Sequence, residues 1–341
     1  MEIQPMLEKL TSVPRLASLI SGLLAVAAGS AAQSFNYSAI DVPCSACAGG
    51  IARSTSAQGI NPAGDIVGFY VDAVGMTNGY LFSHGQFTTI DVPGSLAGVA
   101  GVLPTVARAI NPSGDVVGNY IAPVSTSPQS SPDFCPAAGS PACIKGFLYS
   151  HGTFSTVLVP GHPGAIPQRI TPDGDIYGCL HDFDLMASMF GFVRTRFGYF
   201  SLTLGGGELA NPSLSVAASM NNGATPDGHT IAGGWTDMMT GLTHGYVVSE
   251  GNFQSYDVPG SNSTFIWDMN PAGAFVGVDH AGRNHGFLQL PDGPAPITVD
   301  PPNSVNAAAV GINPGGVIVG QYTDSTGHLH GFLAVPALAT N

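Results

Sequence analysis

Histidine and aspartate side chains recur at fixed places in this sequence, and their types and spacing are suited to chemistry. Three histidines stand directly before a glycine and an aromatic residue, and an aspartate precedes each of them in the same loop. The pairs are Asp237 with His244, Asp279 with His285, and Asp324 with His330. Such pairs can act as acid and base or as metal ligands. Because a catalytic site is normally needed once, we expect each pair to hold a hairpin loop together through a hydrogen bond.

Two polar clusters do not follow the repeat. They are His181 with Asp182 and Asp184, and Asp279 with His280 and His285. Carboxylates and imidazoles bind divalent cations, although the calcium-loop spacing is absent, and solvated loops are the alternative reading. The candidate metal ligands are Asp182, Asp184, Asp279 and His280. The sequence identifies no catalytic residue and indicates no cofactor beyond such a divalent cation.

These residues belong to a repeat that organises nearly the whole chain. The phrase [IM]-[NT]-P-x-G recurs, with a looser copy at residues 224–228, and its prolines lie 43 to 60 residues apart. They are Pro62, Pro112, Pro172, Pro226, Pro271 and Pro314. Glycine (46 residues) and proline (27 residues) are frequent, which disfavours long helices. A period of this length is typical of a propeller blade.

Each unit has the same order of segments. A short apolar run leads into N-P-x-G, which suits a type I turn, and three more runs rich in Val, Ile, Tyr and Phe follow. The second run contains a glycine, at 68, 118, 178, 277 and 320, where we expect a neighbouring aromatic ring or backbone to come close. The fourth run ends in Asp-Val-Pro in several copies, which suits an edge strand. Each unit is therefore predicted to be a four-stranded antiparallel meander.

The sequence predicts an all-β fold, a six-bladed β-propeller of four-stranded antiparallel blades. The runs are apolar on both faces, as in sheets stacked between neighbours. The sixth copy stops after its third strand, and residues 35–43 provide the missing fourth. We therefore expect the propeller to be closed by pairing of the N-terminal and C-terminal strands. An open β-solenoid is the alternative, but this unit is too large for one solenoid turn.

The motifs I-N-P-x-G-x-[IV]-V-G, H-G-[FY]-[LV] and [IY]-D-V-P-G together resemble the HAF-type extracellular repeat of secreted bacterial proteins. The resemblance covers residues 35 to 335. In the first three copies Asn78, Lys145 and Phe190 replace the histidine of the second motif. The resemblance implies secretion and a propeller-like β fold, and it implies no catalytic residues.

Residues 1–32 have the features of a secretory signal peptide. Lys9 and Arg15 precede the apolar run 16–28, and small residues follow at 30–32. An ordinary N-terminal helix is the alternative. Residues 33–341 are predicted to form a single β-propeller domain, with no membrane span after signal cleavage. We expect a protein secreted into the periplasm or the medium.

The five cysteines fit an oxidising compartment only in part. Cys135 and Cys143 bracket the insertion at residues 121–144, and we expect them to form a disulfide. Cys44 and Cys47 form a C-x-x-C with no second copy, so a local disulfide or two free thiols is expected rather than zinc. Cys179 is expected to be a small buried apolar residue.

The net charge of −13 excludes nucleic acid as a partner, because phosphate binding needs lysine and arginine. The sequence favours an extracellular binding or scaffolding module, monomeric, with a glycan or protein ligand. A lyase or hydrolase acting on extracellular carbohydrate is a second hypothesis, but no carboxylate pair can be placed for it. A purely structural envelope protein is the third.

Overall fold

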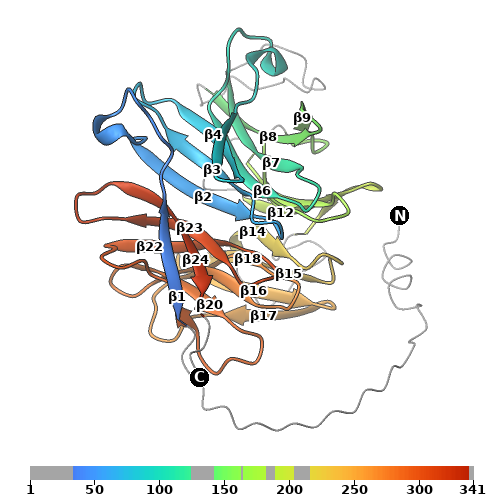
Figure 1. The fold of residues 1–341 in the computed structure, drawn as a ribbon. Coiled ribbons are helices and arrows are strands. Elements are labelled where there is room, and N and C mark those ends of the chain that lie inside the picture. Colours follow the sequence, from blue (N-terminus) through green and yellow to red (C-terminus); the bar gives the residue numbers. More distant parts are fainter. Residues whose placement is uncertain (1–33, 124–141, 163, 182–188, 203–215, 338–341) are drawn as a thin grey trace, which may run out of the picture. The chain divides into compact units, whose positions relative to one another are not determined.

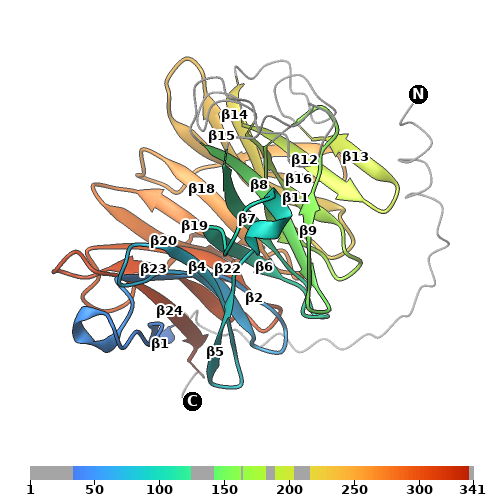
Figure 2. The same cartoon turned by 90° about the horizontal axis from the view of Figure 1, so that it is seen from above.

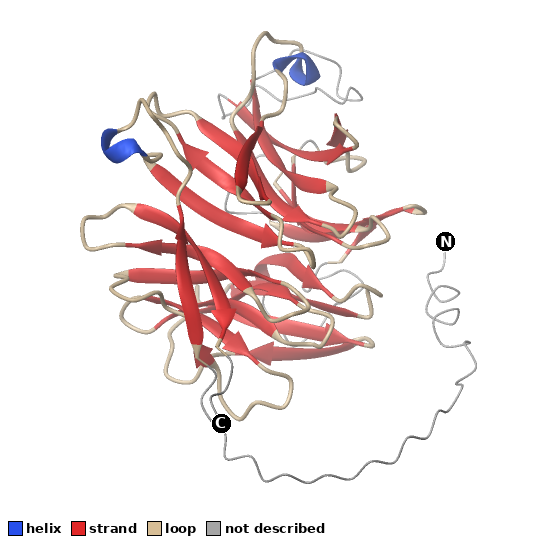
Figure 3. Ribbon diagram, in the orientation of Figure 1, coloured by secondary structure: helices blue, strands red, loops and turns tan. Residues whose placement is uncertain are grey.

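β-Strands make up almost all of the regular structure in a computed structural model that describes residues 34–123, 142–162, 164–181, 189–202 and 216–337. Two 3-10 turns, Ala48–Gly50 and Gly94–Ala97, are the helical elements among these residues (Figure 3). The predicted all-β class is therefore confirmed. The predicted signal peptide lies outside the described residues. Within the described ranges, no helix is long and apolar enough to span a membrane.

Four sheets are separate antiparallel meanders, in which each strand pairs with the next along the chain (Figure 1). The first contains β6 (Thr105–Ile110), β7 (Val116–Pro123), β8 (Ala142–Ser150) and β9 (Thr153–Val157). The second contains β10 (Ala165–Ile170), β11 (Ile176–Leu180), β12 (Phe190–Thr195) and β13 (Gly198–Ser201). The third contains β14 (Val216–Ala224), β15 (Thr230–Asp237), β16 (Thr243–Ser249) and β17 (Asn252–Tyr256). The fourth contains β18 (Thr264–Met269), β19 (Phe275–His280), β20 (Asn284–Gln289) and β21 (Ile297–Thr298).

The fifth sheet has eight strands and contains two further meanders. One consists of β2 (Ser54–Ile60), β3 (Ile66–Val71), β4 (Thr77–Ser83) and β5 (Gln86–Ile90). The other consists of β22 (Asn306–Ile312), β23 (Ile318–Thr323), β24 (Leu329–Pro336) and β1 (Phe35–Ile40). In the latter, β1 pairs antiparallel with β24 from Phe35 opposite Pro336 to Ile40 opposite Gly331.

The sheet count differs from the six separate sheets that the sequence predicts. Hydrogen bonding gives four four-stranded sheets and one of eight strands. The physical reason is a single parallel bridge between Ser54 and Leu329, which joins β2 to β24 and so merges two meanders. The predicted antiparallel four-stranded unit itself is confirmed.

The first strand of each meander lies against the first strand of the next. The contacts run in the order β2, β6, β10, β14, β18 and β22, and β22 in turn contacts β2. Figure 2 shows the sheets following one another in chain order, from blue β2 to red β24. Each first strand is therefore in contact with the first strands of two other meanders, and β2 and β22 meet although they lie far apart in the chain.

A glycine in the second strand of each meander receives an aromatic ring from the third strand. A Cβ atom on Gly320 would overlap the carbonyl oxygen of Ala308 and lie 2.7 Å from Cε1 of Phe332. The six pairs are Gly68–Tyr80, Gly118–Phe147, Gly178–Phe192, Gly233–Tyr246, Gly277–Phe287 and Gly320–Phe332. All six rings are almost fully buried. The predicted close approach at the repeated glycines is confirmed.

Replacing Gly320 with alanine should therefore lower the free energy of unfolding by about 3 kcal/mol, at the upper end of the cost of overpacking. The control is Gly315→Ala, whose new Cβ would meet only Asn313 Oδ1, at 3.3 Å. We expect the control to stay within about 0.5 kcal/mol of the parent protein. Urea unfolding measures both, and equal losses in the two variants would contradict the role given to the glycine.

Candidate functional site

A β-bulge interrupts the first strand of every meander at the same place. In β6, for example, Arg108 is the extra residue between Ala107 and Ala109, which pair with consecutive residues of β7. The six bulged residues are Gln58, Arg108, Gln168, Asn222, Trp267 and Val310. Bulges re-aim side chains and are frequent beside functional sites. Because the first strands contact one another, the bulges bring these residues together.

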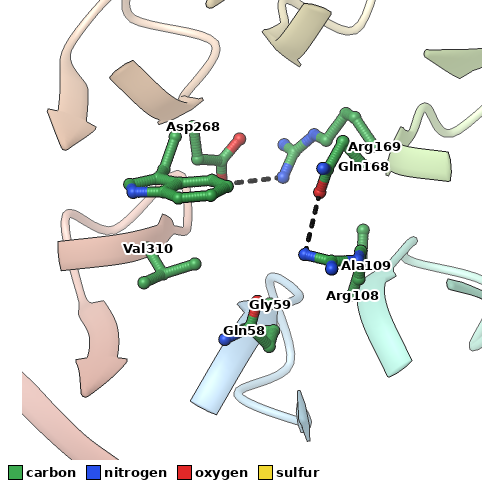
Figure 4. Close-up of a pocket in the computed structure, with 9 residues that line it drawn as sticks. Gln58, Gly59, Arg108, Ala109, Gln168, Arg169, Asp268 and Val310 are labelled. Atoms are coloured by element: carbon green, nitrogen blue, oxygen red, sulfur yellow. Dashed lines mark hydrogen bonds and ion pairs between the residues drawn. The ribbon is translucent and has the colours of Figure 1, made fainter. Parts of the chain in front are cut away.

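Five of the bulged residues line one pocket, which we call the central pocket (Figure 4). Its lining residues are Gln58, Gly59, Arg108, Ala109, Gln168, Arg169, Trp267, Asp268 and Val310. The cavity volume is about 10 Å³, close to the space that a single water molecule needs. The pocket therefore has room for one atom of a ligand or for a monatomic ion, and not for a whole sugar.

An ion pair between β10 and β18 crosses the central pocket. Arg169 Nη1 lies 2.8 Å from Asp268 Oδ2, and the two side chains are 17% and 5% exposed. The Asp268 carboxylate also accepts hydrogen bonds from the backbone amides of Met269 and Ile312. Burial raises the pKa of Asp268, and the Arg169 guanidinium opposes that shift. The Asp268 carboxylate thus links β18 to β10 through Arg169 and to β22 through the Ile312 amide, and these strands belong to three sheets.

The central pocket is rich in hydrogen-bond donors. Arg108 donates to Asn119 Oδ1 at 2.7 Å and to Gln168 Oε1 at 3.3 Å, and burial lowers its pKa. Arg169 Nε and Trp267 Nε1 are buried, and neither has a hydrogen-bond partner among the described residues. Leaving a buried donor unsatisfied costs about 1–3 kcal/mol. The pocket therefore favours an acceptor atom, and its two guanidinium groups favour a negative one.

The central pocket is not predicted by any motif in the sequence. Arg169 and Asp268 are separated by 99 residues, so no local motif joins them. One signal was available: Arg108, Arg169 and Asp268 are charged residues inside otherwise apolar first runs. In a strand covered on both faces, a charge needs a specific partner.

Of the four sequence-predicted metal ligands, the structure describes Asp279 and His280. Asp182 and Asp184 lie outside the described residues. Asp279 accepts a hydrogen bond from Ser261, while His280 Nδ1 lies 2.9 Å from Asn284 Oδ1. Within the described ranges, these two residues belong to no group of three metal-ligating side chains. A metal at this place stays a prediction.

The repeated histidines do bind aspartates, but mainly those that follow the fourth strand, which stand in Asp-Val-Pro for Asp41 and Asp257 and in Val-Asp-Pro for Asp300. His244 Nδ1 lies 2.9 Å from Asp257, His285 Nδ1 lies 2.7 Å from Asp300, and His330 Nδ1 lies 2.9 Å from Asp41. Among the described residues, a loop aspartate reaches its histidine only in the last unit, where Asp324 is 3.5 Å from His330 Nε2. The reason is that the chain segment after the fourth strand runs beside the start of the third. The predicted pairing is found for Asp324 with His330, whereas His244 and His285 bind Asp257 and Asp300 in place of Asp237 and Asp279.

The structure describes four of the five cysteines, all except Cys135. Cys44 and Cys47 form a local disulfide, one of the two alternatives expected for this pair. Cys179 is a free thiol, fully buried in β11, which confirms the expected buried position, and burial raises its pKa to about 12. Cys135 lies outside the described residues, so its link to Cys143 stays a prediction.

Comparison with known proteins shows likeness in structure and none in sequence. The sequence matches no protein-family model and no curated protein. A gluconolactonase from Xanthomonas campestris is 11% identical, with a TM-score of 0.45 over 90% of this chain and 97% of that chain. TolB from Acinetobacter baumannii is 14% identical, with a TM-score of 0.46 over 80% of this chain and 63% of that chain. A protein of unknown function from Dyadobacter fermentans is 9% identical, with a TM-score of 0.48 over 88% of this chain and 99% of that chain. Because all three scores are below 0.5, the fold assignment rests on the strand pairing described above.

Removing one partner of the Arg169–Asp268 pair leaves a buried group without compensation. We expect Asp268→Asn to lower the free energy of unfolding by about 3 kcal/mol. Arg169→Met combined with Asp268→Asn should lose less than the sum of the two single changes. Urea unfolding of the double-mutant cycle measures the coupling, and additive losses would contradict a direct ion pair.

In the meander β2–β5, the first repeat unit along the chain, the aspartate of the Asp-Val-Pro motif has no histidine partner among the described residues. Asn78 stands at the histidine position, and Asp91 accepts a hydrogen bond from the Gly79 amide at 3.0 Å. Burial raises the pKa of Asp91 from 3.8 to about 6, although that hydrogen bond opposes the shift. Asp91 therefore binds a proton more readily in the folded protein than in the unfolded chain.

This shift gives a pH-dependent contribution to stability. The contribution of Asp91 is fully present below pH 3.8 and is lost as the pH rises through about 6. Asp91→Asn keeps a side-chain acceptor and removes the ionisation, so its stability relative to the parent should increase from pH 4 to pH 7. Thermal unfolding of this variant and the parent across that range measures the difference. A difference independent of pH for Asp91→Asn would refute the prediction.

Proposed function

We propose that this protein is a secreted six-bladed β-propeller of the HAF-repeat kind, which acts as an extracellular binding module. We propose further that its central pocket takes up a small anionic group, such as one carboxylate oxygen of an acidic glycan or peptide. The observation that carries this proposal is the pair of buried donors without acceptors, Arg169 Nε and Trp267 Nε1.

The number of blades follows from treating the eight-stranded sheet as two blades. Each half is a complete four-stranded meander, and a single parallel bridge links them. Side-chain amides of the N-P-x-G turns support a closed ring, because each donates to the backbone carbonyl of the corresponding turn in the next unit. These bonds are Asn61 to Asn111, Asn111 to Thr171, Asn270 to Asn313, and Asn313 back to Asn61, at 3.4 to 3.5 Å.

The charge distribution supports an anionic ligand. The chain has 9 lysines and arginines against 22 acidic residues. Two of those arginines, Arg108 and Arg169, line the central pocket, and only Asp268 opposes them there. Guanidinium groups hold carboxylates through paired hydrogen bonds, and a buried site strengthens each bond.

Binding is better supported than carbohydrate hydrolysis. A glycosidase of the common kind uses two carboxylates, one on each side of the scissile bond. The described lining of the central pocket contains one carboxylate, Asp268, and the ion pair with Arg169 already engages it. The pocket as described therefore suits recognition of a group rather than cleavage of a bond.

The two tryptophans of the chain make a direct test possible. Trp235→Phe leaves Trp267 as the only fluorescent indole, and Trp235 stacks on His244 rather than lining the central pocket. In this background we expect a saturable change in fluorescence on titration with acetate or chloride. Arg169→Lys keeps a positive charge for Asp268 and removes the Nε donor, so it should weaken binding about tenfold, or about 1.4 kcal/mol.

The matched control is Arg194→Lys, because Arg194 lies over Tyr199 and does not line the central pocket. This control should bind the anion with unchanged affinity. A titration with no saturable signal, confirmed by calorimetry, would refute anion binding. Equal weakening by both lysine variants would show that the effect is not specific to the central pocket.

A further inference from the structure

Three metal-ligating side chains meet where the two ends of the described chain pair. Asp41 directly follows β1, His330 lies in β24, and His328 directly precedes that strand. One ligand atom from each residue lies within 4.8 Å of the other two. Of the described residues, these are the only ones that form such a group of three. We propose that Asp41, His328 and His330 bind one divalent transition-metal ion of the zinc type, which links β1 to β24.

The spacing of the donor atoms suits such an ion. His330 Nδ1 lies 2.9 Å from Asp41 Oδ1, and the two side chains are 14% and 18% exposed. Two ligands of a tetrahedral zinc, each about 2.0–2.1 Å from the metal, lie roughly 3.3 Å apart. The Asp41–His330 pair is therefore close to the ligand spacing that zinc needs, and the His328 ligand atom lies within 4.8 Å of both. The stacked ring of Tyr322, 5.0 Å from that of His330, holds the imidazole plane in place.

A second and independent observation comes from His328. Its Nε2 atom is buried and has no hydrogen-bond partner among the described residues. The ring lies 4.5 Å from the ring of His330, so two imidazoles share one side of the Asp41 carboxylate. A buried polar atom without a partner calls for an explanation such as an ion. Asp324 lies 3.5 Å from His330 Nε2, the ring nitrogen that does not face Asp41, so it can orient the imidazole rather than bind the ion.

The meander β18–β21, the fifth repeat unit along the chain, has an arginine at the position that corresponds to His328. Arg283 stands two residues before His285, as His328 stands two residues before His330. Arg283 Nη2 lies 2.8 Å from Asp300, so a permanent cation neutralises that carboxylate. In the sixth unit an imidazole replaces the guanidinium, and a bound metal would supply the positive charge instead.

The donor set selects the class of metal. Two imidazoles and one carboxylate are typical of zinc and of neighbouring transition metals, whereas calcium prefers oxygen ligands alone. Because Asp41 and His330 come from opposite ends of the described chain, the ion cross-links the closing strands. Binding to the folded state alone raises its stability by mass action.

The test uses the purified protein after dialysis against a chelator, with zinc added back. We expect one zinc ion per chain by elemental analysis and a melting temperature higher by roughly 5 °C in excess zinc. Cobalt(II) should bind at the same site and give the visible absorption of a tetrahedral complex. A melting temperature that zinc does not change, together with no retained metal, would overturn the proposal.

Three variants distinguish this site from other histidines at the surface. His328→Gln keeps the Asp41–His330 contact and should lose both bound zinc and the rise in melting temperature. His328→Arg copies the fifth unit and should also lose zinc binding while restoring stability without it. His244→Gln, which disrupts a histidine–aspartate pair with no second histidine beside it, should keep the zinc response of the parent. Zinc bound by His328→Gln with the parent's affinity and stoichiometry would also overturn the proposal.

Discussion

The contact between a strand glycine and a buried aromatic ring is the constraint on which the rest of this structure depends. In all six meanders the ring of the third strand occupies the space where a Cβ atom of the second strand would lie, as Phe332 does at Gly320. Because the ring lies against the backbone, the two strands can hold only one register. A register shift by one residue would move the ring to the other face and the glycine away from it. This contact therefore fixes the meander, and the meander fixes where its first strand lies.

The first strands then approach one another so closely that side chains have little room between them. A Cβ atom on Gly59 would lie 2.7 Å from the carbonyl oxygen of Arg108, in the neighbouring meander. The bulge beside each such position displaces one residue per strand out of the ladder. Where that residue is Val310 the displacement adds an apolar contact, but where it is Arg108 or Trp267 it adds a donor to the central pocket. A repeated backbone feature thus makes a site whose chemistry differs from strand to strand.

The aspartate that follows the fourth strand also has a shared backbone position but different side-chain partners. In the four units that have this aspartate it lies beside the third strand, but its partner differs from unit to unit. Asp91 receives only a backbone amide and is easily protonated, whereas Asp257 has a histidine. Asp300 has a histidine and an arginine, and Asp41 has two histidines beside it. One position in the repeat therefore ranges from a proton-binding carboxylate to a candidate metal ligand.

Local patterns in the sequence are enough to specify the repeating unit. The N-P-x-G turns, the glycine of the second strand and the aromatic residue of the third all act within about 50 residues, so the meander and the close approach at Gly320 could be predicted. The pairing of β1 with β24 could also be predicted, because the last unit lacks a strand that residues 35–43 supply. The merging of two meanders by the Ser54–Leu329 bridge could not, since it depends on how closely two complete units approach.

The candidate sites form only through tertiary packing. Arg169 and Asp268 are 99 residues apart, and Asp41 and His330 are 289 residues apart, so no spacing in the sequence relates them. Their meeting depends on the angle at which each meander contacts the next, which many weak contacts set together. The sequence pattern specifies strands and turns because these obey local geometry, whereas the position of a side chain across the centre depends on the packing of every unit between.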